Sequence, residues 1–594
     1  MTRRHAPDRH MHGHLAVLIL LTVVSVLVMI AFGSWHLAAQ FTGDTIPSNP
    51  WMAFGRSRYR AMWTPLATVF TAIAEFVVIG AAAIVAARVM KRGSEIDRRA
   101  KVLTSPRQLT GIAGPTAVAK AQRLRPDLVD VDAPGAIGLH LGQAVHEKVS
   151  IAQSYEDTLV GFAGPRTGKT AGAAIGSVID APGPVLATSN KRDLRDHTRG
   201  LRETHGRRVW ESDLQGITGE PHQDWFWNPF KNLTSLKDGR RLAGRFIDAE
   251  TIDGGQVNSY FDGGAAELIA LYFLAASVGG GDVLHSYAWL SDADNPKPAA
   301  LLRAAGHPIA AEKMRTAQGL NRRQRDGLYD VARRNLNVLT EPTYLRTVLP
   351  PTRIQIPGDD SDLARYLPTH DLPEFDLGDF VRSSDALYAL SMEGADSASA
   401  LTTALVGAII DEALKLARRS GGRLPVPLVA VLDEAANVCK LSELPAWYSH
   451  LGSQGVICQT WLQSPQQGRR VWNDGLDQLV SASNLHYYGG GVKDNEYLGN
   501  IAQAIGNHDV QRWSQSFSAA GGRSHSQSWS AELAMPVSVL AEMDIDRAIV
   551  LSTGNAPVLI KKAWWSDRPD AHLIEASAAK YGVTQEVSTT KELL

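Results

Sequence analysis

A loop that reads AGPRTGKT at residues 163–170 constrains the fold of this chain more than any other feature. It follows a short apolar run at 158–162 and leads into a stretch of small residues at 171–181. Backbone amides at a helix N-terminus can cradle a polyphosphate, and glycine allows its close approach. The first position is alanine rather than glycine, which is tolerated where φ is negative. The sequence predicts a phosphate-binding loop made of Ala163, Gly164, Pro165, Arg166, Thr167, Gly168, Lys169 and Thr170.

The segments around this loop alternate between strand and helix patterns. A second buried strand is predicted at 183–188, and residues 237–346 then show helical periodicity with little β-branching. Strand candidates return at 386–390, 426–432, 455–462, 485–488 and 548–551, with a helical segment at 397–419. The pattern predicts an α/β fold whose sheet is interrupted by an all-helical insertion and then resumed.

An acidic pair directly follows the apolar strand candidate at 426–432. Asp433 is placed to hold Mg²⁺ through the shell of water around the metal. Glu434 is the better candidate to polarise an attacking water. Elsewhere an Asp-Glu pair after an apolar run is usually the start of a solvated loop. Its combination with a phosphate-binding loop favours catalysis.

A third candidate, Gln463, ends the strand candidate at 455–462. If this strand neighbours the acidic strand, Gln463 lies beside the γ-phosphate, where its amide can hydrogen-bond both water and phosphate. The alternative is an ordinary polar helix cap. We therefore predict ATP and Mg²⁺ as cofactors, with Thr170 and Asp433 on the metal. The predicted catalytic residues are Lys169, Asp433, Glu434 and Gln463.

Two apolar stretches predict membrane-spanning helices. Residues 15–32 carry no charge over eighteen positions, and residues 64–87 are apolar apart from Glu75. Basic residues lie before the first stretch and after the second, which predicts that both of these ends face the cytoplasm. The expected protein is therefore a multi-pass protein of the cell inner membrane, with most of the chain cytoplasmic. A cleavable signal peptide is the alternative for the first stretch. We expect Glu75 to face another helix or subunit, or to be protonated.

Composition excludes several classes of protein. The 60 Lys and Arg residues nearly balance 61 Asp and Glu, which excludes a bulk-charge nucleic-acid binder but allows a local basic channel. Cys439 and Cys458 can form neither a disulfide framework nor a zinc site, so a reducing compartment fits best. The mean hydropathy of −0.13 conceals the apolar N-terminal stretches.

Alternating serines lie on both sides of Gly521 and Gly522. Two edge strands joined at a glycine turn produce such a pattern, so a polar hairpin is predicted. A flexible serine-rich loop is the alternative.

The order of these elements resembles the coupling ATPases of conjugative type IV secretion, the TraG-type coupling protein family. The resemblance covers nearly the whole chain. It rests on the two N-terminal spans, AGPRTGKT, NKRDL at 190–194, WNPF at 227–230, YFDGGAAELIA in the helical region, VLDEAANV at 431–438, QSPQQ at 463–467 and PVLIKKAWW at 557–565.

The resemblance implies a RecA-like P-loop ATPase domain with an all-α insertion domain, preceded by two transmembrane helices. It further implies a ring, expected to be a homo-hexamer, whose DNA-stimulated ATPase passes a relaxase with its attached single-stranded DNA to the type IV secretion channel proteins. The expected parts are a membrane anchor at 1–100, a connector at 101–150, a nucleotide-binding domain at 151–236 and 347–577, an all-α substrate-recognition domain at 237–346, and a flexible tail at 578–594.

One position departs from the pattern of this family. Many relatives have an arginine where Gln454 stands, and that arginine is expected to reach the nucleotide of a neighbouring subunit. Glutamine cannot supply the charge, and an arginine acting in trans can raise the rate by several orders of magnitude. The departure bears on hydrolysis rather than on nucleotide binding. The candidate replacements are Arg166, Arg469 and Arg470.

Two alternatives to a DNA-transfer ATPase stay open. One is a docking ring that binds ATP for assembly and recruits substrate; Gln454 favours it, whereas the intact catalytic set argues against it. The other is an FtsK-like DNA pump. That family usually carries a winged-helix module after its motor, and no basic recognition helix is found near the C-terminus of this sequence.

Overall fold

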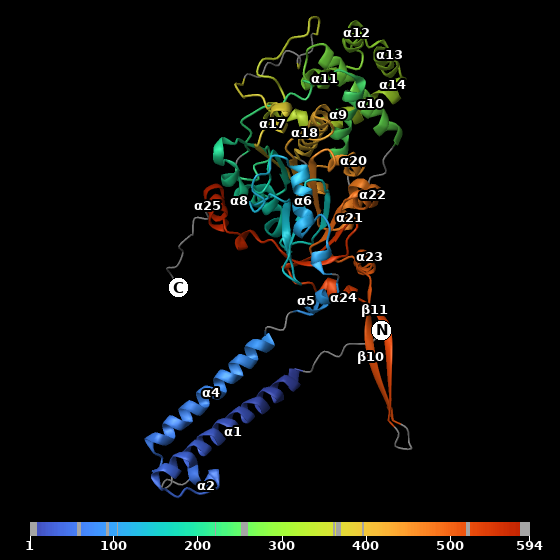
Figure 1. Ribbon diagram of the computed structural model, residues 1–594. Helices are drawn as coiled ribbons and strands as arrows, with labels where there is room; N and C mark the ends of the chain where they lie inside the picture. The colour runs from blue at the N-terminus through green and yellow to red at the C-terminus, as the bar shows by residue number, and fades with distance from the viewer. Residues whose placement is uncertain are drawn as a thin grey trace. The chain divides into compact units, whose positions relative to one another are not determined.

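The structure is a computed structural model. It describes residues 9–55, 61–90, 94–103, 105–219, 221–250, 259–359, 363, 370–394, 397–517 and 523–582. The chain divides into two compact units, Met1–Ser94 and Glu95–Leu594 (Figure 1).

The N-terminal unit is a helical hairpin of α1 (Arg9–Thr42) and α4 (Pro65–Met90), with the short helix α2 (Pro50–Gly55) between them. Its small core contains Trp35, Ala38, Ala53 and Ala67. Alanines at the contact allow the helix backbones to approach closely. The indole of Trp35 donates a hydrogen bond to the carbonyl of Met62, which joins α1 to the segment before α4.

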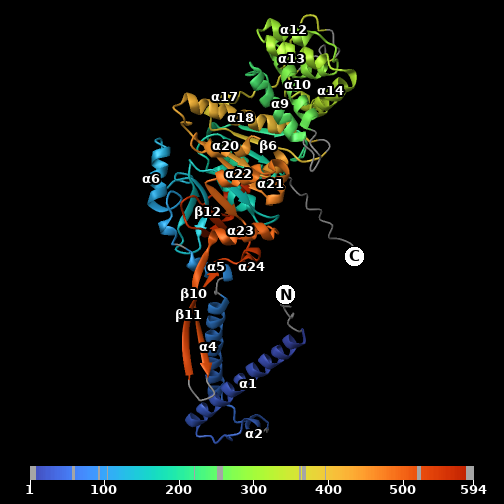
Figure 2. The same cartoon turned by 90° about the vertical axis from the view of Figure 1, so that its right-hand side faces the viewer.

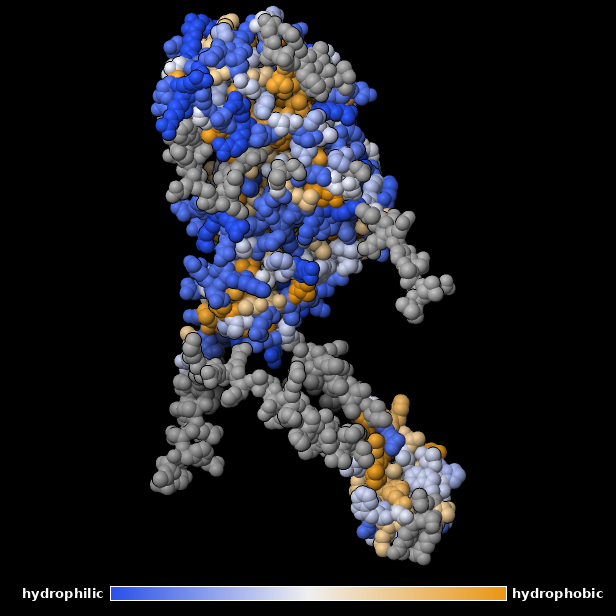
Figure 3. Space-filling model, turned by 180° about the vertical axis from the view of Figure 1, so that it is seen from behind, coloured by the Kyte–Doolittle hydropathy of each residue, from blue (hydrophilic) through white to orange (hydrophobic). Residues whose placement is uncertain are grey.

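Among the described residues, one helix is long and apolar enough to cross a membrane, over Ser25–Thr42 of α1. The apolar stretch of α4 is shorter, Pro65–Val78, and Glu75 lies half-buried within it. The described residues therefore support one candidate span and do not support the multi-pass prediction; a second span stays a prediction. Figure 3 shows hydrophobic side chains on this unit, whereas the visible surface of Glu95–Leu594 is mostly hydrophilic.

One mixed sheet organises the unit Glu95–Leu594. Its strand order is β2-β1-β13-β12-β9-β3-β8-β7-β4-β6-β5. The strands are β1 (Leu139–Ala144), β2 (Ser150–Gln153), β3 (Leu159–Phe162), β4 (Val185–Ser189), β5 (Val209–Asp213), β6 (Ala386–Leu390), β7 (Leu428–Leu432), β8 (Val456–Leu462), β9 (Leu485–Tyr488), β12 (Arg547–Ser552) and β13 (Val558–Lys562).

Seven neighbouring strands pair in parallel, in the order β9, β3, β8, β7, β4, β6 and β5. Beyond β9, the strands β12, β13, β1 and β2 extend the sheet by antiparallel pairing. Every residue of β3, β4, β6, β7 and β8 is buried, as expected for apolar strands covered on both faces. The predicted α/β class is confirmed. The predictions did not include four strands as such. Strand β1 lies in the predicted connector at 101–150 and β2 directly follows it, the acidic residues Glu211 and Asp213 mask the pattern of β5, and β13 was noted only as a sequence resemblance.

Helices cover the sheet on both faces. Helix α8 (Asp193–Arg202) packs against the C-terminal helix α25 (Ala571–Tyr581), and α18 (Ser399–Arg419) contributes to the core on the other face. The predicted tail begins too early, because α25 continues to Tyr581. The ring of Tyr581 lies 4.5 Å from the guanidinium of Arg199, and its carbonyl accepts a hydrogen bond from Arg192, so contacts with α8 hold this end of the helix.

A group of helices lies between β5 and β6. Figures 1 and 2 show α9 to α14 gathered at one end of this unit, with α9 next to α18. These helices share one hydrophobic core with the sheet and α18, so their status as a separate domain stays a prediction. Their bounds are α9 (Leu236–Glu250), α10 (Ser259–Val278), α11 (Val283–Leu290), α12 (Lys297–Ala304), α13 (Pro308–Gln318), α14 (Arg322–Asn335) and α15 (Pro342–Leu345).

The predicted hairpin is present as β10 (Asn507–Phe517) and β11 (Arg523–Leu533). The two strands pair antiparallel from Asn507 opposite Leu533 to Phe517 opposite Arg523. The predicted glycine turn lies outside the described residues. At the base of the hairpin, Arg99 of helix α5 (Glu95–Arg99) donates hydrogen bonds to the carbonyls of Leu533 and Ala534.

Candidate active site

The loop 163–170 connects β3 to a helix, as the sequence predicts. The Ala163 amide donates to the Leu462 carbonyl, and the Gly164 amide donates to the Gly490 carbonyl, so neighbouring strand ends hold the start of the loop. The helix opens with a π-helical turn, η3 (Thr170–Ala174), and continues as α7 (Ile175–Ile179). Ala163 is not among the residues with positive φ, so a side chain is tolerated there.

Two glycines of the loop have no room for a side chain. A Cβ atom at Gly164 would lie 2.2 Å from the carbonyl oxygen of Gly491. Gly168 has φ +79°, and a Cβ atom there would lie 2.2 Å from the ring of Trp564. The loop backbone is therefore packed closely between the segments that follow β9 and β13, which fixes its path from the strand to the helix.

The acidic pair lies at the carboxyl end of β7 and meets the loop. Lys169 Nζ lies 2.9 Å from Asp433 Oδ1 and 2.5 Å from Glu434 Oε1. The Thr170 hydroxyl donates to Asp433 Oδ2 at 3.3 Å. All three charged side chains are buried, and Glu434 has a left-handed backbone with φ +54°. The pair is therefore a buried ion-paired group and not the start of a solvated loop.

Gln463 joins this group from the strand between the loop and the acidic pair. Strand β8 lies between β3 and β7, which satisfies the condition on which the prediction depended. The Gln463 side-chain amide donates to Glu434 Oε1 at 3.0 Å. The cap of helix α21 (Pro465–Trp472) is Ser464, whose hydroxyl accepts a hydrogen bond from the Gln467 amide. The helix-cap alternative for Gln463 is therefore wrong.

Burial and the ion pairs set the protonation of the group. Burial lowers the pKa of Lys169, but Asp433 and Glu434 outweigh it and the pKa lies above its ordinary value. Burial raises the pKa of Asp433 despite the attraction of Lys169. For Glu434 burial also raises the pKa, but the Lys169 ammonium outweighs it and the pKa is lowered. Lys169 and Glu434 are therefore charged at neutral pH.

The donor set fits a magnesium nucleotide. Asp433 Oδ1 is buried and accepts no hydrogen bond beside its ion pair with Lys169, and the Thr170 hydroxyl lies next to the same carboxylate. In the described part of the chain, no three His, Cys, Asp or Glu side chains gather as a metal site. Mg²⁺ is usually held by one or two carboxylates together with phosphates and water, so a small protein ligand set suits it.

Sequence reasoning missed Lys562, the last residue of β13. Its ammonium donates to the carbonyls of Thr167 at 2.7 Å, Gly489 at 2.8 Å and Ile545 at 2.8 Å. Burial lowers its pKa to about 8. The only sequence signal is the apolar run VLI before it, which indicates a strand but not the loop that this strand reaches.

The turn that carries Gln454 lies at the amino end of β8, whereas Gln463 follows its carboxyl end. The guanidinium of Arg423 donates to the carbonyls of Gly452 at 2.8 Å and Ser453 at 3.1 Å. Sequence reasoning did not single out this arginine. The predicted replacements lie elsewhere: Arg166 is exposed on the loop and Arg469 lies 3.8 Å from Asp477.

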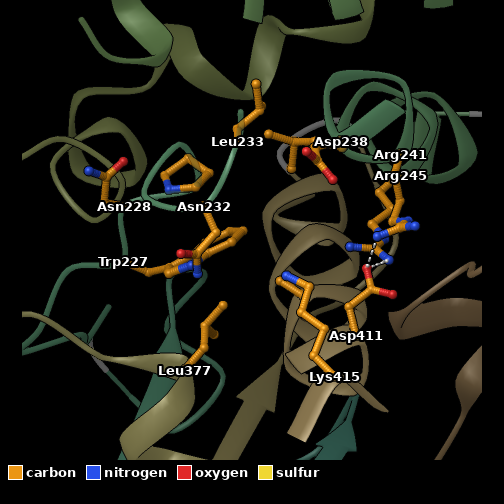
Figure 4. A pocket seen from close by; sticks show the side chains of 13 residues that line it. Trp227, Asn228, Asn232, Leu233, Asp238, Arg241, Arg245, Leu377, Asp411 and Lys415 are labelled. Carbon is orange, nitrogen blue, oxygen red and sulfur yellow. Dashed lines mark hydrogen bonds and ion pairs between the residues drawn. The ribbon is translucent and has the colours of Figure 1, made fainter. Parts of the chain in front are cut away.

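Helix α9 contacts the segment that follows the acidic pair. Arg245 is 3% exposed and makes ion pairs with Asp411 of α18 at 2.6 Å and Glu443 at 3.1 Å. Figure 4 shows Arg241 and Arg245 directed toward Asp411, across a small cavity from Trp227 and Asn228 of the WNPF segment. Asp248 accepts a hydrogen bond from the Ser442 amide. The helical region thus touches the chain eight to nine residues after Glu434.

Comparison with known proteins agrees with the predicted resemblance. Residues 427–545, which include Asp433, Glu434 and Gln463, match a family model described as the TraM recognition site of TraD and TraG. The resemblance to TraG-type coupling proteins is thereby confirmed over these residues. No curated protein matches the chain.

Several solved structures are similar to the chain. The bacterial conjugative coupling protein TrwBdeltaN70, in an unbound form, is 14% identical with a TM-score of 0.49 over 75% of this chain and 93% of that chain. The plasmid coupling protein TrwB in complex with ADP and Mg²⁺ is 13% identical with a TM-score of 0.48 over 74% and 91%. VirB4 of Thermoanaerobacter pseudethanolicus is 12% identical with a TM-score of 0.38 over 73% and 98%.

Proposed function

We propose that this chain is a membrane-anchored, RecA-like ATPase that couples relaxase-bound single-stranded DNA to a conjugative type IV secretion channel. The observation that carries the proposal is the contact of Lys169 with Asp433 and Glu434, with Gln463 on the same carboxylate. The family match over 427–545 supports the coupling role, because it includes the acidic pair and Gln463.

Each residue of the group has a distinct proposed task. The loop amides and Lys169 bind the phosphates of ATP, while Thr170 and Asp433 hold Mg²⁺, which when bound offsets the negative charge of the phosphates. Lys169 leaves the two carboxylates to reach the phosphates. Glu434 then loses its cation and can accept a proton from water. Gln463 holds Glu434 in place and orients that water.

The partners are proposed from the same resemblance. The matched family is described as a TraM recognition site, which favours a protein partner for residues 427–545. A homo-hexameric ring, the relaxase and channel proteins as partners, and the substrate-recognition role of helices α9 to α15 are further parts of the proposal. An inner-membrane location completes it, supported by the one candidate span, Ser25–Thr42, with a second span over residues 64–87 as a further part of the proposal.

One observation favours the docking ring as a second candidate. Gln454 carries no charge, and the guanidinium of Arg423 at the same turn is occupied by backbone carbonyls. If no other arginine acts in trans, hydrolysis is slow and ATP serves assembly. No observation on the described residues favours the FtsK-like pump.

Substitution of Lys169 tests the proposal. Lys169→Ala in the full-length protein is expected to abolish ATP binding, DNA-stimulated hydrolysis and transfer from donor cells. The matched control is Lys101→Ala, which removes an exposed lysine and is expected to change none of these. Unchanged hydrolysis in the Lys169→Ala protein would refute the site. Bound ATP with no DNA-stimulated turnover in the wild-type ring would favour the docking ring.

A further inference from the structure

The side-chain amide of Gln467 contacts two residues of the candidate active site from the first turn of α21. Its Nε2 donates to Glu434 Oε2 at 3.4 Å and to Asn437 Oδ1 at 2.7 Å. Its Oε1 accepts a hydrogen bond from the backbone amide of Gln463 at 2.8 Å. The orientation of the amide follows from these partners, because an ionised carboxylate only accepts and a backbone N–H only donates. One half-buried side chain thus joins Glu434 to Gln463.

The two carboxylate oxygens of Glu434 have different partners. Oε1 lies 2.5 Å from Lys169 Nζ and accepts a hydrogen bond from the Gln463 side chain at 3.0 Å. Oε2 accepts the hydrogen bond from Gln467. When Lys169 moves to the phosphates, Oε1 loses its cation, whereas Oε2 keeps its donor. Because the terminal torsion of a glutamate is soft, a donor on Oε2 keeps Oε1 directed toward the position that Lys169 leaves.

Gln467 also holds the backbone around Glu434. The left-handed conformation of Glu434, with φ +54°, is unfavourable for a residue with a side chain and persists where surrounding contacts fix it. Glu434 directly precedes the short helix α19 (Ala435–Val438), and the Asn437 amide donates to the Glu434 carbonyl at 2.8 Å. Because Gln467 binds the side chain of Asn437, it connects the chain after β7 to the chain after β8.

Helix capping is the structural alternative for this side chain. Ser464 and Gln467 have the spacing of a capping box, and the Ser464 hydroxyl accepts a hydrogen bond from the Gln467 backbone amide at 3.3 Å. A cap uses the side-chain oxygen of Gln467 as an acceptor and does not need its NH₂ group. The two hydrogen bonds that this NH₂ group donates, to Asn437 and Glu434, leave the helix end. They are therefore the contacts that capping does not explain.

We propose that Gln467 is a positioning residue for ATP hydrolysis, which holds Glu434 and Gln463 in their relative positions once Lys169 has moved to the phosphates. The inference rests on the proposed function, because it takes Glu434 as the base and Gln463 as the group that orients the water. Since Gln467 acts through these two residues, its loss lowers kcat and leaves ATP binding in place.

Two substitutions of Gln467 separate positioning from capping. Gln467→Met keeps the length of the side chain but removes both the acceptor and the donor. Gln467→Glu restores the acceptor that a capping box uses, but it cannot donate and it places a second carboxylate against Glu434. The measurements are DNA-stimulated hydrolysis at saturating ATP, and calorimetric binding of ATP with Mg²⁺, on the full-length protein in detergent.

Both variants are expected to lower kcat by about 10–100-fold. Gln467→Met should bind ATP within about threefold of the wild-type affinity, which also shows that its site is folded. The matched control is Gln466→Met, at the neighbouring exposed position, and it should keep the wild-type kcat. A kcat within about twofold of wild type in either Gln467 variant would overturn the inference. Loss of ATP binding in Gln467→Met would overturn it as well, because the side chain would then be needed to build the site.

A double-mutant cycle with Glu434→Gln tests whether Gln467 acts through the carboxylate. In the Glu434→Gln protein, Gln467→Met is expected to lower the single-turnover rate by less than about twofold, and an undiminished loss there would overturn the inference. The cycle also identifies failure of the proposed function. If Glu434→Gln alone hydrolyses ATP at the wild-type rate, the assignment of the base fails and the role of Gln467 fails with it, whereas slow hydrolysis in Glu434→Gln beside a normal Gln467→Met refutes the role of Gln467 alone.

Discussion

The ammonium of Lys562 lies 2.7 Å from the carbonyl oxygen of Thr167 and ties the last strand of the sheet to the phosphate-binding loop. Its other two donors reach Gly489 and Ile545, so one side chain holds three segments of backbone. Gly172, on the first turn of the helix after the loop, packs against the stem of this lysine. The loop conformation thus depends on a residue 395 positions away in the chain.

We expect Lys562→Met to lower the free energy of unfolding by about 1–3 kcal/mol, because three carbonyls, of which that of Gly489 is buried, lose their donor. The wild type should also show a pH dependence that the variant lacks. The pKa of Lys562 is lowered to about 8 in the folded protein, whereas an ordinary lysine has a pKa of about 10.4. Between these two pH values the unfolded chain binds more protons than the folded chain, so the free energy of unfolding rises with pH, at most by about 1.4 kcal/mol per pH unit. Urea unfolding of both proteins across this window measures the slope. Parallel pH profiles would contradict the assignment.

Glu434→Gln should separate nucleotide binding from hydrolysis. The substitution keeps the size of the side chain and leaves Asp433 beside Lys169, so ATP binding should persist. Loss of the general base should lower the hydrolysis rate by about 10²–10⁴-fold. Glu312→Gln, at an exposed position of α13, is the control. Hydrolysis at the wild-type rate in Glu434→Gln would assign the base elsewhere.

Arg245→Met should destabilise the protein, because it removes the buried cation of Asp411 and Glu443 and leaves them only the longer ion pairs with Arg241, at 3.4 Å and 3.8 Å. Removal of one partner of a buried ion pair costs about 3–5 kcal/mol, and the loss should be smaller here because Arg241 remains. Gly407→Ala tests the same contact from α18, since its Cβ atom would lie 2.3 Å from Arg245 Nε. Gly499→Ala is the control, because nothing lies within 4 Å of a Cβ atom there. Equal unfolding midpoints for the two alanine variants would show that the Arg245 contact adds little.

A labelling experiment should determine the number of membrane spans. Cys439 and Cys458 are buried, and burial raises their pKa values to about 12 and about 11, so neither reacts readily. With two spans, a membrane-impermeant maleimide added to spheroplasts labels Ser48→Cys, between α1 and α4, but not Ser291→Cys. After lysis both are labelled. Identical labelling of the two positions before lysis would mean that α4, which separates them in the chain, does not cross the membrane.

Local patterns were enough to predict much of this protein. The loop at 163–170, the acidic pair after 426–432 and Gln463 after 455–462 each combine an apolar strand with the polar residues directly after it. Strand β9 has the predicted bounds, and β6 does as well. The errors occurred where burial does not follow hydrophobicity, as in β5, whose buried acids are held by arginines such as Arg195 on Glu211.

The sequence by itself determined that a phosphate-binding loop, an acidic pair and an amide each follow a strand, because strand periodicity and turn chemistry are local properties. The tertiary structure alone decided which strands are neighbours. It placed β8 between β3 and β7, so that Gln463 reaches Glu434, and brought Lys562 and Trp564 against the loop. Strand order depends on pairing between distant segments, whose free energy comes from a shared core that no local stretch of sequence contains.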